Sequence, residues 1–536
     1  MGNVTHTIHY RGHTTNAITA RKRCMAQANT RLYDALAQVI GTLGQDGGLI
    51  SPSVYDTAQL LRFQPPQEGV TPAITWLKAQ QSADGGWGDP AVPLARDIPT
   101  LAAILALQQY SVAHDAHPHI AHGLAFLRDN AAEWLRAHID LLPIAAEMIL
   151  PRLLADAAAV GLVIDTAPYA ELYALAAKKR AALTRVDITA GSAPTYSWEA
   201  LDRPFDPSLI DGQGSVGHSP AATAYWLHQA ANADACASST AVARARTYLA
   251  QAAASTQTGI PGVVPTVWPL ESFDYLYALY ACVQNGLHRD PVIAPLLGPA
   301  VATIHKLLNT HGGLGFSPDF IVDVDCTGVG VVGLAEFGHT SDPGVIMAFH
   351  RNDHFFTYAY ELNPSTFSNA HAMFALNQLG IARPDTVDFV VQSELAEGGW
   401  RPDKWHSSWI YTSMEVCYAL RGPAFAPYWR RLVSRLLTAQ HEDGAWYRGG
   451  IANLLDTSYA VMTLRLAAAD DVLDPAARAR LQCAESWLLS HAQVSMLDDE
   501  YLWMGKELYS PRRVDQAYVL STLWAVLHAP TCSHHE

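Results

Sequence analysis

Two carboxylic acids lie one residue apart inside an apolar stretch of the chain. Asp323 and Asp325 are framed by the apolar residues 320–322 and by Val324. Removal from water disfavours a charged carboxylate, so at least one of these groups can keep its proton at neutral pH. A protonated carboxylic acid in a dry pocket is a Brønsted acid. From these residues alone, a helix N-terminus capped by aspartate is an equally good interpretation.

Length and composition limit the kind of protein that can carry these acids. The chain has 536 residues, which is too long for one ordinary core, so we expect at least two domains. Hydrophobic residues make up 49% and charged residues 16%, well below the usual quarter. The net charge is −15 and no basic cluster occurs, so we expect no nucleic-acid partner.

The N-terminal sequence, the apolar runs and the cysteines indicate the compartment in which we expect the protein. The N-terminal stretch has no apolar core of the secretory kind, and no apolar run reaches ~18 residues, so we expect no signal peptide and no transmembrane helix. We expect a cytoplasmic protein, with docking on a membrane surface left open. The cysteines are scattered without a CxxC pair, which predicts reduced thiols; they are Cys24, Cys236, Cys282, Cys326, Cys417, Cys483 and Cys532.

Helical periodicity dominates the segments that must position the acids. Residues 26–44 place Leu32, Leu36 and Leu43 on one face at helical spacing. Ser51-Pro52, Ser219-Pro220 and Ser510-Pro511 each predict a helix start, with a serine cap followed by proline. Alternation of the kind found in strands is nearly absent. The sequence therefore predicts an all-α fold.

A loop pattern recurs along the chain. A glycine pair or Asp-Gly is followed by Trp, Phe or Val in residues 80–88, 211–217, 311–316, 392–400 and 440–446. The spacing of about 45 residues suits two helices with their loops, which is an αα-hairpin unit. Stacked hairpins can close into a ring of inner and outer helices. Ordinary glycine signals at helix ends are the alternative, which five instances of one pattern disfavour.

A proline-rich segment divides the chain. Residues 255–270 cannot form a regular helix, because they carry Pro261, Gly262, Pro265 and Pro269. We therefore predict one helical domain over residues 45–262 and a second over residues 263–536. We expect residues 1–44 to pack with the second domain.

Several motifs, taken in order, resemble those of a known family. They are SPSVYDTAQLL (51–61), QSADGGWGDP (81–90), DGQGSVGHSPAATAYWL (211–227), VPTVWPLESFDYL (264–276), VDVDCTG (322–328), RPDKWHSSWIYT (401–412) and LWMGKELYSPRRV (502–514). Together they resemble the class II terpene cyclases, and within them the bacterial diterpene cyclases that form copalyl-, halimadienyl- or clerodienyl-type diphosphates. The resemblance implies two α-helical double-barrel domains, γ and β, with the active site between them.

The resemblance assigns roles to the acids. In the family's Asp-x-Asp-Asp motif the middle acid, here Asp325, protonates the terminal alkene of a prenyl diphosphate, and Asp323 shares or relays the proton. An alkene is a very weak base, so the acid must be dry and oriented. Cys326 replaces the last acid of the motif, as in cyclases acting on epoxides. Asn369 and His371 are the next candidates to hydrogen-bond the acid.

The resemblance also concerns how the reaction ends. Relatives that form the unrearranged bicycle quench the cation with a His and an Asn through a water. By motif order, Tyr196 stands at the His position and Thr266 at the Asn position, and neither is a comparable base. We therefore predict a rearranged, halimane- or clerodane-type product. Packing of Tyr196 as a core aromatic is an equal alternative.

Further candidates would shield the cation and hold the diphosphate. Aromatic faces stabilise cations, and the candidates are Trp268, Tyr275, Phe316, Trp400, Trp405 and Trp503. A basic segment, Lys178, Lys179 and Arg180, resembles one that contacts the diphosphate in relatives, and Lys404 and Lys506 are further candidates. Glu147 resembles a family acid near the top of the site, which implies a role in assisting Mg²⁺ or in supporting the proton-donating acid. Packing, solvation and a buried polar contact are the respective alternatives.

Parts of the sequence also match other functions. Asp470, Asp471 and Asp474 match the first metal motif of class I synthases, but no second metal motif follows, so we expect a loop or helix cap there. Cyclisation of farnesyl diphosphate to a drimane, a helical-hairpin scaffold and a two-carboxylate glycoside hydrolase are the remaining alternatives. The expected product keeps its diphosphate, so a downstream class I synthase or phosphatase is the expected partner.

Overall fold

The computed structural model describes residues 29–135, 142–233, 238–358, 361, 363–492 and 499–528. Within these ranges the regular structure is helical apart from four two-stranded antiparallel hairpins, which confirms the all-α prediction. The four described cysteines are unpaired thiols. Residues 1–28, with Cys24, and the positions of Cys236 and Cys532 lie outside the described residues.

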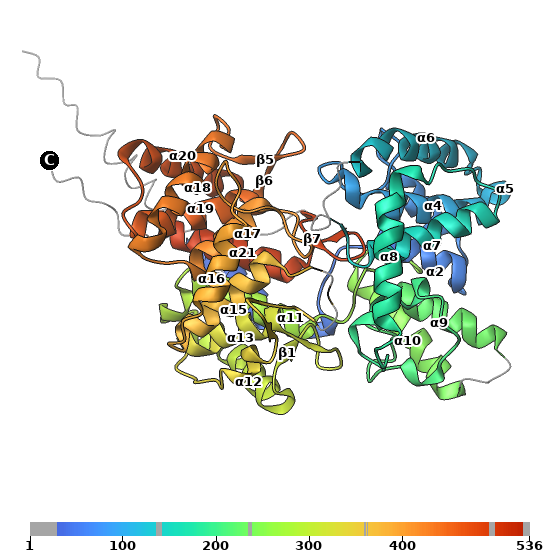
Figure 1. The fold of residues 1–536 in the computed structure, drawn as a ribbon, viewed down its shortest axis with the longest axis horizontal. Coiled ribbons are helices and arrows are strands. Elements are labelled where there is room, and N and C mark those ends of the chain that lie inside the picture. Colours follow the sequence, from blue (N-terminus) through green and yellow to red (C-terminus); the bar gives the residue numbers. More distant parts are fainter. Residues whose placement is uncertain are drawn as a thin grey trace, which may run out of the picture.

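The first half of the chain forms the N-terminal barrel, coloured blue to green in Figure 1. Its helices are α2 (Val54–Phe63), α3 (Thr71–Ala79), α4 (Asp97–Gln109), α5 (Ser111–His114), α6 (His117–Trp134), α7 (Ala146–Ala159), α8 (Ala170–Leu183), α9 (Pro220–Asn232) and α10 (Ser239–Ser255). Helix α2 packs on α4 and α9, and α4 packs on α7. The 3-10 segment η5 (Ala193–Ala200) contacts both α7 and α9 and completes the ring.

The second half forms the C-terminal barrel, coloured yellow to red. Its helices are α11 (Glu271–Gln284), α12 (Ala294–His311), α13 (Val324–Glu336), α14 (Gly344–Met347), α15 (Thr366–Gln378), α16 (Pro384–Gln392), α17 (Trp409–Ala419), α18 (Ala426–Ala439), α19 (Leu454–Ala469), α20 (Pro475–His491) and α21 (Arg512–Leu527). Helices α11, α13, α15, α17, α19 and α21 pack each on the next, and α21 returns to α11. This closed inner ring is surrounded by the remaining helices.

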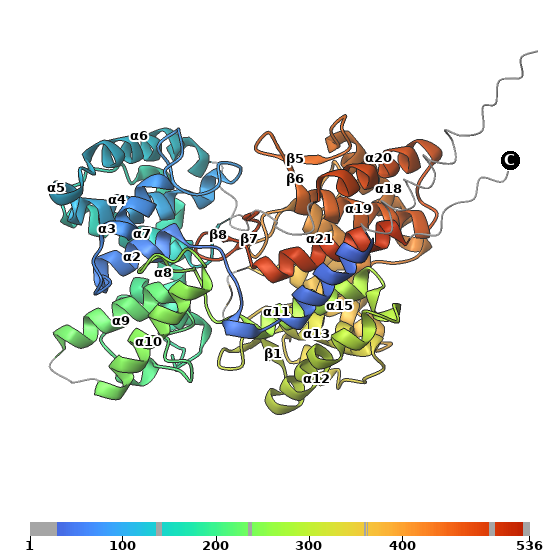
Figure 2. The ribbon, with the colours of Figure 1, turned by 180° about the vertical axis from the view of Figure 1, so that it is seen from behind.

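Each barrel has its own core of buried apolar residues. Residues 29–41 are helical, and their Leu32, Leu36 and Ile40 belong to the core of the C-terminal barrel. Figure 2 shows this blue helix lying across that barrel. Whether the barrels are independent domains divided near residue 262 stays a prediction.

Short hairpins connect helices at the ends of the barrels. They are β1 (Leu314–Gly315) with β2 (Val322–Asp323), β3 (His350–Arg351) with β4 (His354–Phe355), β5 (Trp446–Arg448) with β6 (Ile451–Asn453), and β7 (Trp503–Met504) with β8 (Leu508–Tyr509). The first pairs Leu314 with Asp323 and leads directly into α13. Figure 1 shows β7 in the region where the two barrels meet.

The recurring loop pattern joins an outer helix to the next inner helix through hydrogen bonds of its tryptophan. Trp87, Trp400 and Trp446 each donate their indole N–H to a carbonyl oxygen ten residues earlier. The backbone N–H of each tryptophan donates to a Ser or Thr hydroxyl of the inner helix that follows. All three side chains are at most 2% exposed. Identical bonds at three places confirm a repeated unit.

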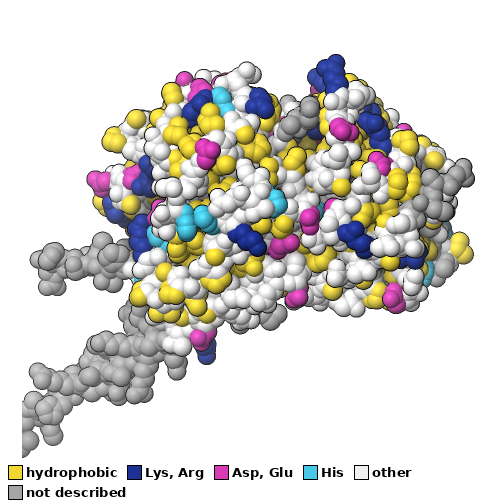
Figure 3. Space-filling model, turned by 90° about the horizontal axis from the view of Figure 1, so that it is seen from below, with side chains coloured by type: hydrophobic (Ala, Val, Ile, Leu, Met, Phe, Trp, Pro, Cys, Tyr) yellow, Lys and Arg dark blue, Asp and Glu magenta, His cyan; other side chains and the backbone are white. Residues whose placement is uncertain are grey.

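The surface agrees with the composition. Figure 3 shows one face, on which basic side chains stand in small separate groups among acidic and apolar ones. Among the described helices, none combines the length and apolar composition that a membrane crossing requires.

Candidate active site

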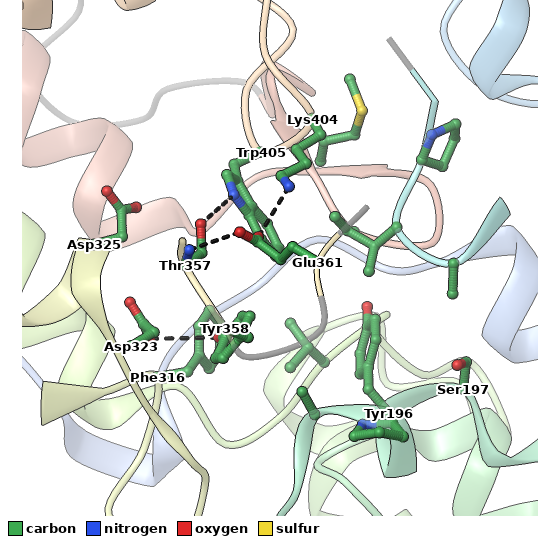
Figure 4. Close-up of a pocket in the computed structure, with 18 of the residues that line it drawn as sticks. Tyr196, Ser197, Phe316, Asp323, Asp325, Thr357, Tyr358, Glu361, Lys404 and Trp405 are labelled. Carbon is green, nitrogen blue, oxygen red and sulfur yellow. Dashed lines mark hydrogen bonds and ion pairs between the residues drawn. The ribbon is translucent and has the colours of Figure 1, made fainter. Parts of the chain in front are cut away.

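A cavity of about 240 Å³ lies between the two barrels. The N-terminal barrel lines it with α7, α8 and η5, and the C-terminal barrel lines it with α11, α13 and the β7–β8 hairpin. The predicted residues that line it are Glu147, Lys179, Tyr196, Phe316, Asp323, Asp325, Cys326, Lys404, Trp405 and Trp503. Figure 4 shows Asp323 and Asp325 on one side of this view and Tyr196 on the other.

Asp323 caps the helix that carries the acid motif. It is the N-cap residue of α13, and its Oδ1 accepts a hydrogen bond from Cys326 N at 2.7 Å. Its Oδ2 accepts from the Tyr358 hydroxyl at 3.4 Å (Figure 4). Burial is the main cause that raises the pKa of Asp323 to about 8. The cap interpretation is therefore confirmed for Asp323, and its carboxyl group also stays protonated at neutral pH.

Asp325 lies in the first turn of α13 and is 8% exposed, at the cavity wall. Its Oδ2 accepts a hydrogen bond from the Tyr277 hydroxyl at 2.5 Å. Its Oδ1 lies 2.6 Å from Nδ1 of His371, which confirms the predicted contact between His371 and the acid. Both oxygens are thus fixed by neighbours on α11 and α15.

His371 is held between two carboxyl groups. Its Nδ1 faces Asp325, and its Nε2 lies 3.1 Å from Oε2 of Glu415 on α17. Burial alone would lower the pKa of His371, but Asp325 and Glu415 outweigh it and raise the pKa to about 10. The imidazole is therefore positively charged at neutral pH.

Cys326 takes the place of the third acid as a neutral thiol. It is 3% exposed, and burial with the two neighbouring aspartates raises the pKa of its thiol well above the ordinary value. The thiol lies beside the Asp323 carboxyl group and acts to lower the pKa of that group. Cys326 therefore adds a weak donor to the Asp323 carboxyl group and no charge.

Asn369 does not contact the acid, contrary to the prediction. Its Oδ1 accepts from Phe355 N at 2.7 Å, and its Nδ2 donates to Phe355 O at 2.9 Å and to Ser365 O at 2.7 Å. Residues two apart on a helix point to different sides of it, so Asn369 does not share the partner of His371 and fixes β4 instead. It is a structural residue.

Tyr196 and Thr266 pair with each other. The two hydroxyl oxygens lie 3.1 Å apart, and Gly505 packs against both side chains. Burial raises the pKa of Tyr196 well above its ordinary value. Tyr196 therefore presents a neutral hydroxyl to the cavity, which is a poor base.

Stacked aromatic rings extend from the acid along one wall. The Phe273 ring lies 4.2 Å from Tyr277 and 4.8 Å from Phe316, measured between centroids. Trp503 meets Phe273 and Tyr277 edge-on at 5.1 and 5.2 Å. Ring faces stabilise cations without acting as nucleophiles or bases. Phe316 and Trp503 are confirmed as cavity residues, and Trp405 also lines the cavity.

The other three predicted aromatics lie away from the cavity. Trp268 packs over Gly47 and donates its indole N–H to Asp46 O at 3.2 Å. Tyr275 packs over Gly44. Trp400 is one of the recurring tryptophans described above, and it donates its indole N–H to Val390 O. These three predictions are wrong because each ring fills a gap beside a loop.

Lysines from both barrels reach the cavity. Lys179 on α8 lies 3.9 Å from Glu147, while Lys178 and Arg180 point to the exposed face of the same helix. Lys404 pairs with Glu361 at 2.9 Å (Figure 4), and it also hydrogen-bonds Asn363 O. A helix presents only one residue in three or four to a given wall, so of the basic segment only Lys179 lines the cavity.

Lys506 is buried away from the cavity, contrary to the prediction. Its Nζ donates to Glu199 Oε1 and to Ser219 Oγ, both at 2.6 Å, and lies 3.8 Å from Asp56. It therefore ties the β7–β8 hairpin into the N-terminal barrel.

The residues present fit a magnesium ion only with help from a ligand. Among the described residues, no three His, Cys, Asp or Glu side chains cluster to hold a metal. Glu147 and Glu361 each line the cavity and are partly buried, at 14% and 8% side-chain exposure. Mg²⁺ is usually bound by one or two carboxylates together with substrate phosphates and water. One carboxylate beside a diphosphate meets that requirement.

The class I-like motif is a surface turn. Asp474 caps α20 by accepting from Ala477 N at 2.7 Å. Asp470 pairs with Arg421, and Asp471 pairs with Arg478. The prediction of a loop or helix cap is confirmed, and the motif lies outside the cavity.

Tyr277, Tyr358, Glu361 and Glu415 were not foreseen. Tyr277, Tyr280 and Gln284 recur on one face of α11, which is a local signal for polar groups turned inward. Glu415 is an acid within the apolar sequence of α17, which is a local signal for a buried charge. No local pattern indicates that its partner is His371.

Comparisons with known proteins extend over nearly the whole chain. No family model matches. The chain is 38% identical over 510 residues to a (+)-kolavenyl diphosphate synthase from Herpetosiphon aurantiacus, with 92% of this chain and 97% of that protein covered. A copalyl diphosphate synthase from Streptomyces cyslabdanicus is 31% identical over 536 residues, covering 92% and 96%. The solved ent-copalyl diphosphate synthase from Streptomyces platensis matches with a TM-score of 0.73 at 28% identity, covering 94% and 99%.

Proposed function

The chain belongs to the class II diterpene cyclases, and we propose that it converts geranylgeranyl diphosphate to a bicyclic diterpenyl diphosphate. It is an isomerase: the bonds of the substrate are rearranged and the diphosphate is retained. The observation that carries this function is the placement of Asp325, an acid fixed by Tyr277 and His371 at the wall of an aromatic-lined cavity.

Asp325 starts the reaction by giving its proton to the terminal alkene. The O–H bond of the acid breaks, a C–H bond forms, and the positive charge appears on the neighbouring carbon of the substrate. The carboxylate that remains keeps its hydrogen bonds to Tyr277 and to the His371 imidazolium. Donors already in place for the charge that develops lower the barrier without reorganisation.

The wall then guides the cation. Rings of Phe273, Tyr277 and Phe316 lie in a row beside the acid, and Trp503 covers two of them. The charge can move over ring faces while water is excluded. Two ring closures by the internal alkenes give the bicycle.

A rearranged skeleton follows from the pairing of Tyr196 and Thr266. Their hydroxyl groups bond each other, and the pKa of Tyr196 lies far above neutrality. A bicyclic cation that meets no base at once survives long enough for hydride and methyl shifts, and only then loses one carbon-bound proton, which balances the proton taken from Asp325 and leaves an isomer of the substrate. A halimane- or clerodane-type diphosphate is therefore the proposed product. The similarity to a kolavenyl diphosphate synthase supports it.

The diphosphate lies at the end of the cavity that carries Lys179 and Lys404. Both lysines have acidic neighbours, Glu147 and Glu361, which keep the charges balanced before substrate arrives. When Mg²⁺ is bound it would shield the diphosphate charge, with Glu147 as its protein ligand. Since the product still carries a diphosphate, a class I synthase or a phosphatase is the class of enzyme that would consume it. We place these steps in the cytoplasm.

Incubation with C20 and C15 prenyl diphosphates and Mg²⁺, followed by phosphatase and mass spectrometry, tests the function. We expect a rearranged bicyclic C20 alcohol, and loss of turnover by at least about 10²-fold in Asp325→Asn. Asp470→Asn, in the surface turn, is the control and should behave as the unaltered protein. Turnover in Asp325→Asn would contradict the acid assignment, and an unrearranged copalyl skeleton as sole product would contradict the rearrangement.

A further inference from the structure

Three ionisable groups form a buried row inside the inner ring of the C-terminal barrel. Asp325 on α13, His371 on α15 and Glu415 on α17 come from three successive inner helices. Nδ1 of His371 lies 2.6 Å from Asp325, and Nε2 lies 3.1 Å from Glu415. His371 and Glu415 are fully buried, and only Asp325 reaches the cavity wall.

Burial of the Glu415 carboxylate is energetically unfavourable. Its Oε2 accepts hydrogen bonds from the Tyr280 hydroxyl at 2.7 Å and from Gln284 Nε2 at 3.1 Å. In the part of the chain that the structure describes, Oε1 has no hydrogen-bond partner. A buried carboxylate oxygen left unsatisfied destabilises the fold. Glu415 is therefore poorly explained by packing or stability.

The number of protons in the row explains it. With no proton added, the row carries two negative charges and a neutral imidazole. One proton placed on His371 leaves one net negative charge, and a second proton placed on Asp325 makes the row neutral. Burial favours the arrangement with no net charge. With Glu415 present, the neutral arrangement is the one in which Asp325 carries a proton.

Without the charge of Glu415 the balance changes. Asp325 and His371 would then be neutral together with a single proton, held as an imidazolium beside a carboxylate. Asp325 would have no proton to give. A second proton would leave a net positive charge in the barrel and would enter only at acidic pH.

We propose that Glu415 is a positioning residue of the reaction, which neutralises His371 and thereby lets Asp325 keep the proton that it gives to the alkene. This inference rests on the proposed function. Glu415 touches neither substrate nor the reacting atoms and acts through His371.

Other groups near the row do not disturb this balance below neutral pH. The titratable groups that face it from α11, α13, α17, α21, β8 and the loop before α15 are Tyr277, Tyr280, Asp323, Cys326, Tyr411, Cys417, Tyr418, Tyr358, Tyr509 and Tyr518. Burial raises the pKa of every one of them. Only Asp323, with a pKa of about 8, titrates near neutrality.

Glu415→Gln tests the proposal, because the amide keeps the size of the side chain and removes its charge. Turnover of geranylgeranyl diphosphate is measured from about pH 7 down to about pH 5, below the pKa of Asp323. We expect kcat near pH 7 to fall by roughly 10²-fold and to recover by about tenfold for each pH unit lowered, with KM little changed. The unaltered protein should show no such recovery.

Two further variants separate charge from structure. Tyr280→Phe removes a hydrogen bond to Glu415 but no charge, so it should keep the pH profile of the unaltered protein. The double variant His371→Asn with Glu415→Gln has no imidazolium beside Asp325, so the recovery of kcat at acidic pH that Glu415→Gln shows should be absent from it. Circular dichroism and thermal unfolding show whether each variant is folded.

The outcomes distinguish the inference from the proposed function. An unaltered protein that cyclises no prenyl diphosphate rejects both. An active protein whose Glu415→Gln variant keeps its kcat, or loses it equally at every pH, rejects the inference alone. If Glu415→Gln does not fold, the other variants decide. A kcat that rises as the pH is lowered in Tyr280→Phe, or in the double variant, would also reject the inference alone.

Discussion

Asp323 caps α13 with a carboxyl group that burial keeps protonated up to a pH of about 8. Its ordinary pKa is 3.8, so between these values the folded protein binds a proton that the unfolded chain releases. Its contribution to stability is therefore full below a pH of about 4 and is lost as the pH rises through about 8.

Asp323→Asn should remove this dependence while keeping the helix cap, because asparagine is as good an N-cap as aspartate. We expect the Tm of the variant to rise relative to that of the unaltered protein when both are compared at about pH 5 and then at about pH 8. The comparison isolates this group, since all other buried acids are present in both proteins. A Tm difference that is the same at both pH values would contradict the raised pKa.

At the residue scale, the sequence predicted the proton-donating acid but only some of the side chains that contact it. Asp325 could be predicted because its apolar frame is local, and His371 because motif order brings it close. Glu415 lies 90 positions beyond Asp325 and joins it only because α13, α15 and α17 are neighbours in the inner ring. Asn369 was misplaced because residues two apart on a helix face different partners.

The β7–β8 hairpin is the element through which the C-terminal barrel enters the N-terminal one. Lys506 at its turn is fully buried between Glu199 and Asp56. Glu507 accepts hydrogen bonds from the backbone N–H groups of Val54 and Tyr55 at the start of α2. The hairpin therefore supplies the counter-charge of Glu199 through Lys506. It also caps the N-terminus of α2 through Glu507.

Lys506→Met should destabilise the protein by about 3–5 kcal/mol, because it leaves the buried Glu199 carboxylate without its counter-charge. Denaturant unfolding measures the loss. Adding Glu199→Gln removes the stranded charge, so the double variant should be more stable than Lys506→Met alone. The KM for the prenyl diphosphate should stay the same in folded enzyme, and an increase in it would restore the predicted role in substrate binding.

At the element scale, helix type was easier to predict than helix start. Ser219 caps α9 by accepting from Ala222 N, as the Ser-Pro pair predicts. At the other two pairs α2 begins after Ser53 and α21 begins at Arg512, one or two residues late. There the Ser-Pro segments pair with each other, since Ser51 N donates to Ser510 O at 3.0 Å. A contact between segments so distant in sequence overrides the local signal.

At the scale of the whole molecule, the cavity proposed to hold the substrate lies where the two barrels face each other. The acid, His371 and most aromatic rings belong to the C-terminal barrel, while Lys179, Glu147 and Tyr196 belong to the N-terminal barrel. Sequence predicted a site between two helical units but not which face of α8 would reach it. That choice depends on how α8 packs on α7, which no local pattern encodes.

A ligand that spans the cavity should therefore stabilise both barrels together. An unreactive prenyl diphosphate analogue at 100 times its Kd should add about 2.7 kcal/mol to the free energy of unfolding. The proposed place of its diphosphate is between Lys179 of one barrel and Lys404 of the other, which both line the cavity, so Lys179→Met and Lys404→Met should each reduce the rise in Tm. Lys178→Met is the matched control, because the neighbouring side chain on α8 is exposed and should leave the rise unchanged. An equal reduction by Lys178→Met would mean that the basic segment attracts the diphosphate only by its overall charge, and an undiminished rise in both cavity variants would place the diphosphate elsewhere.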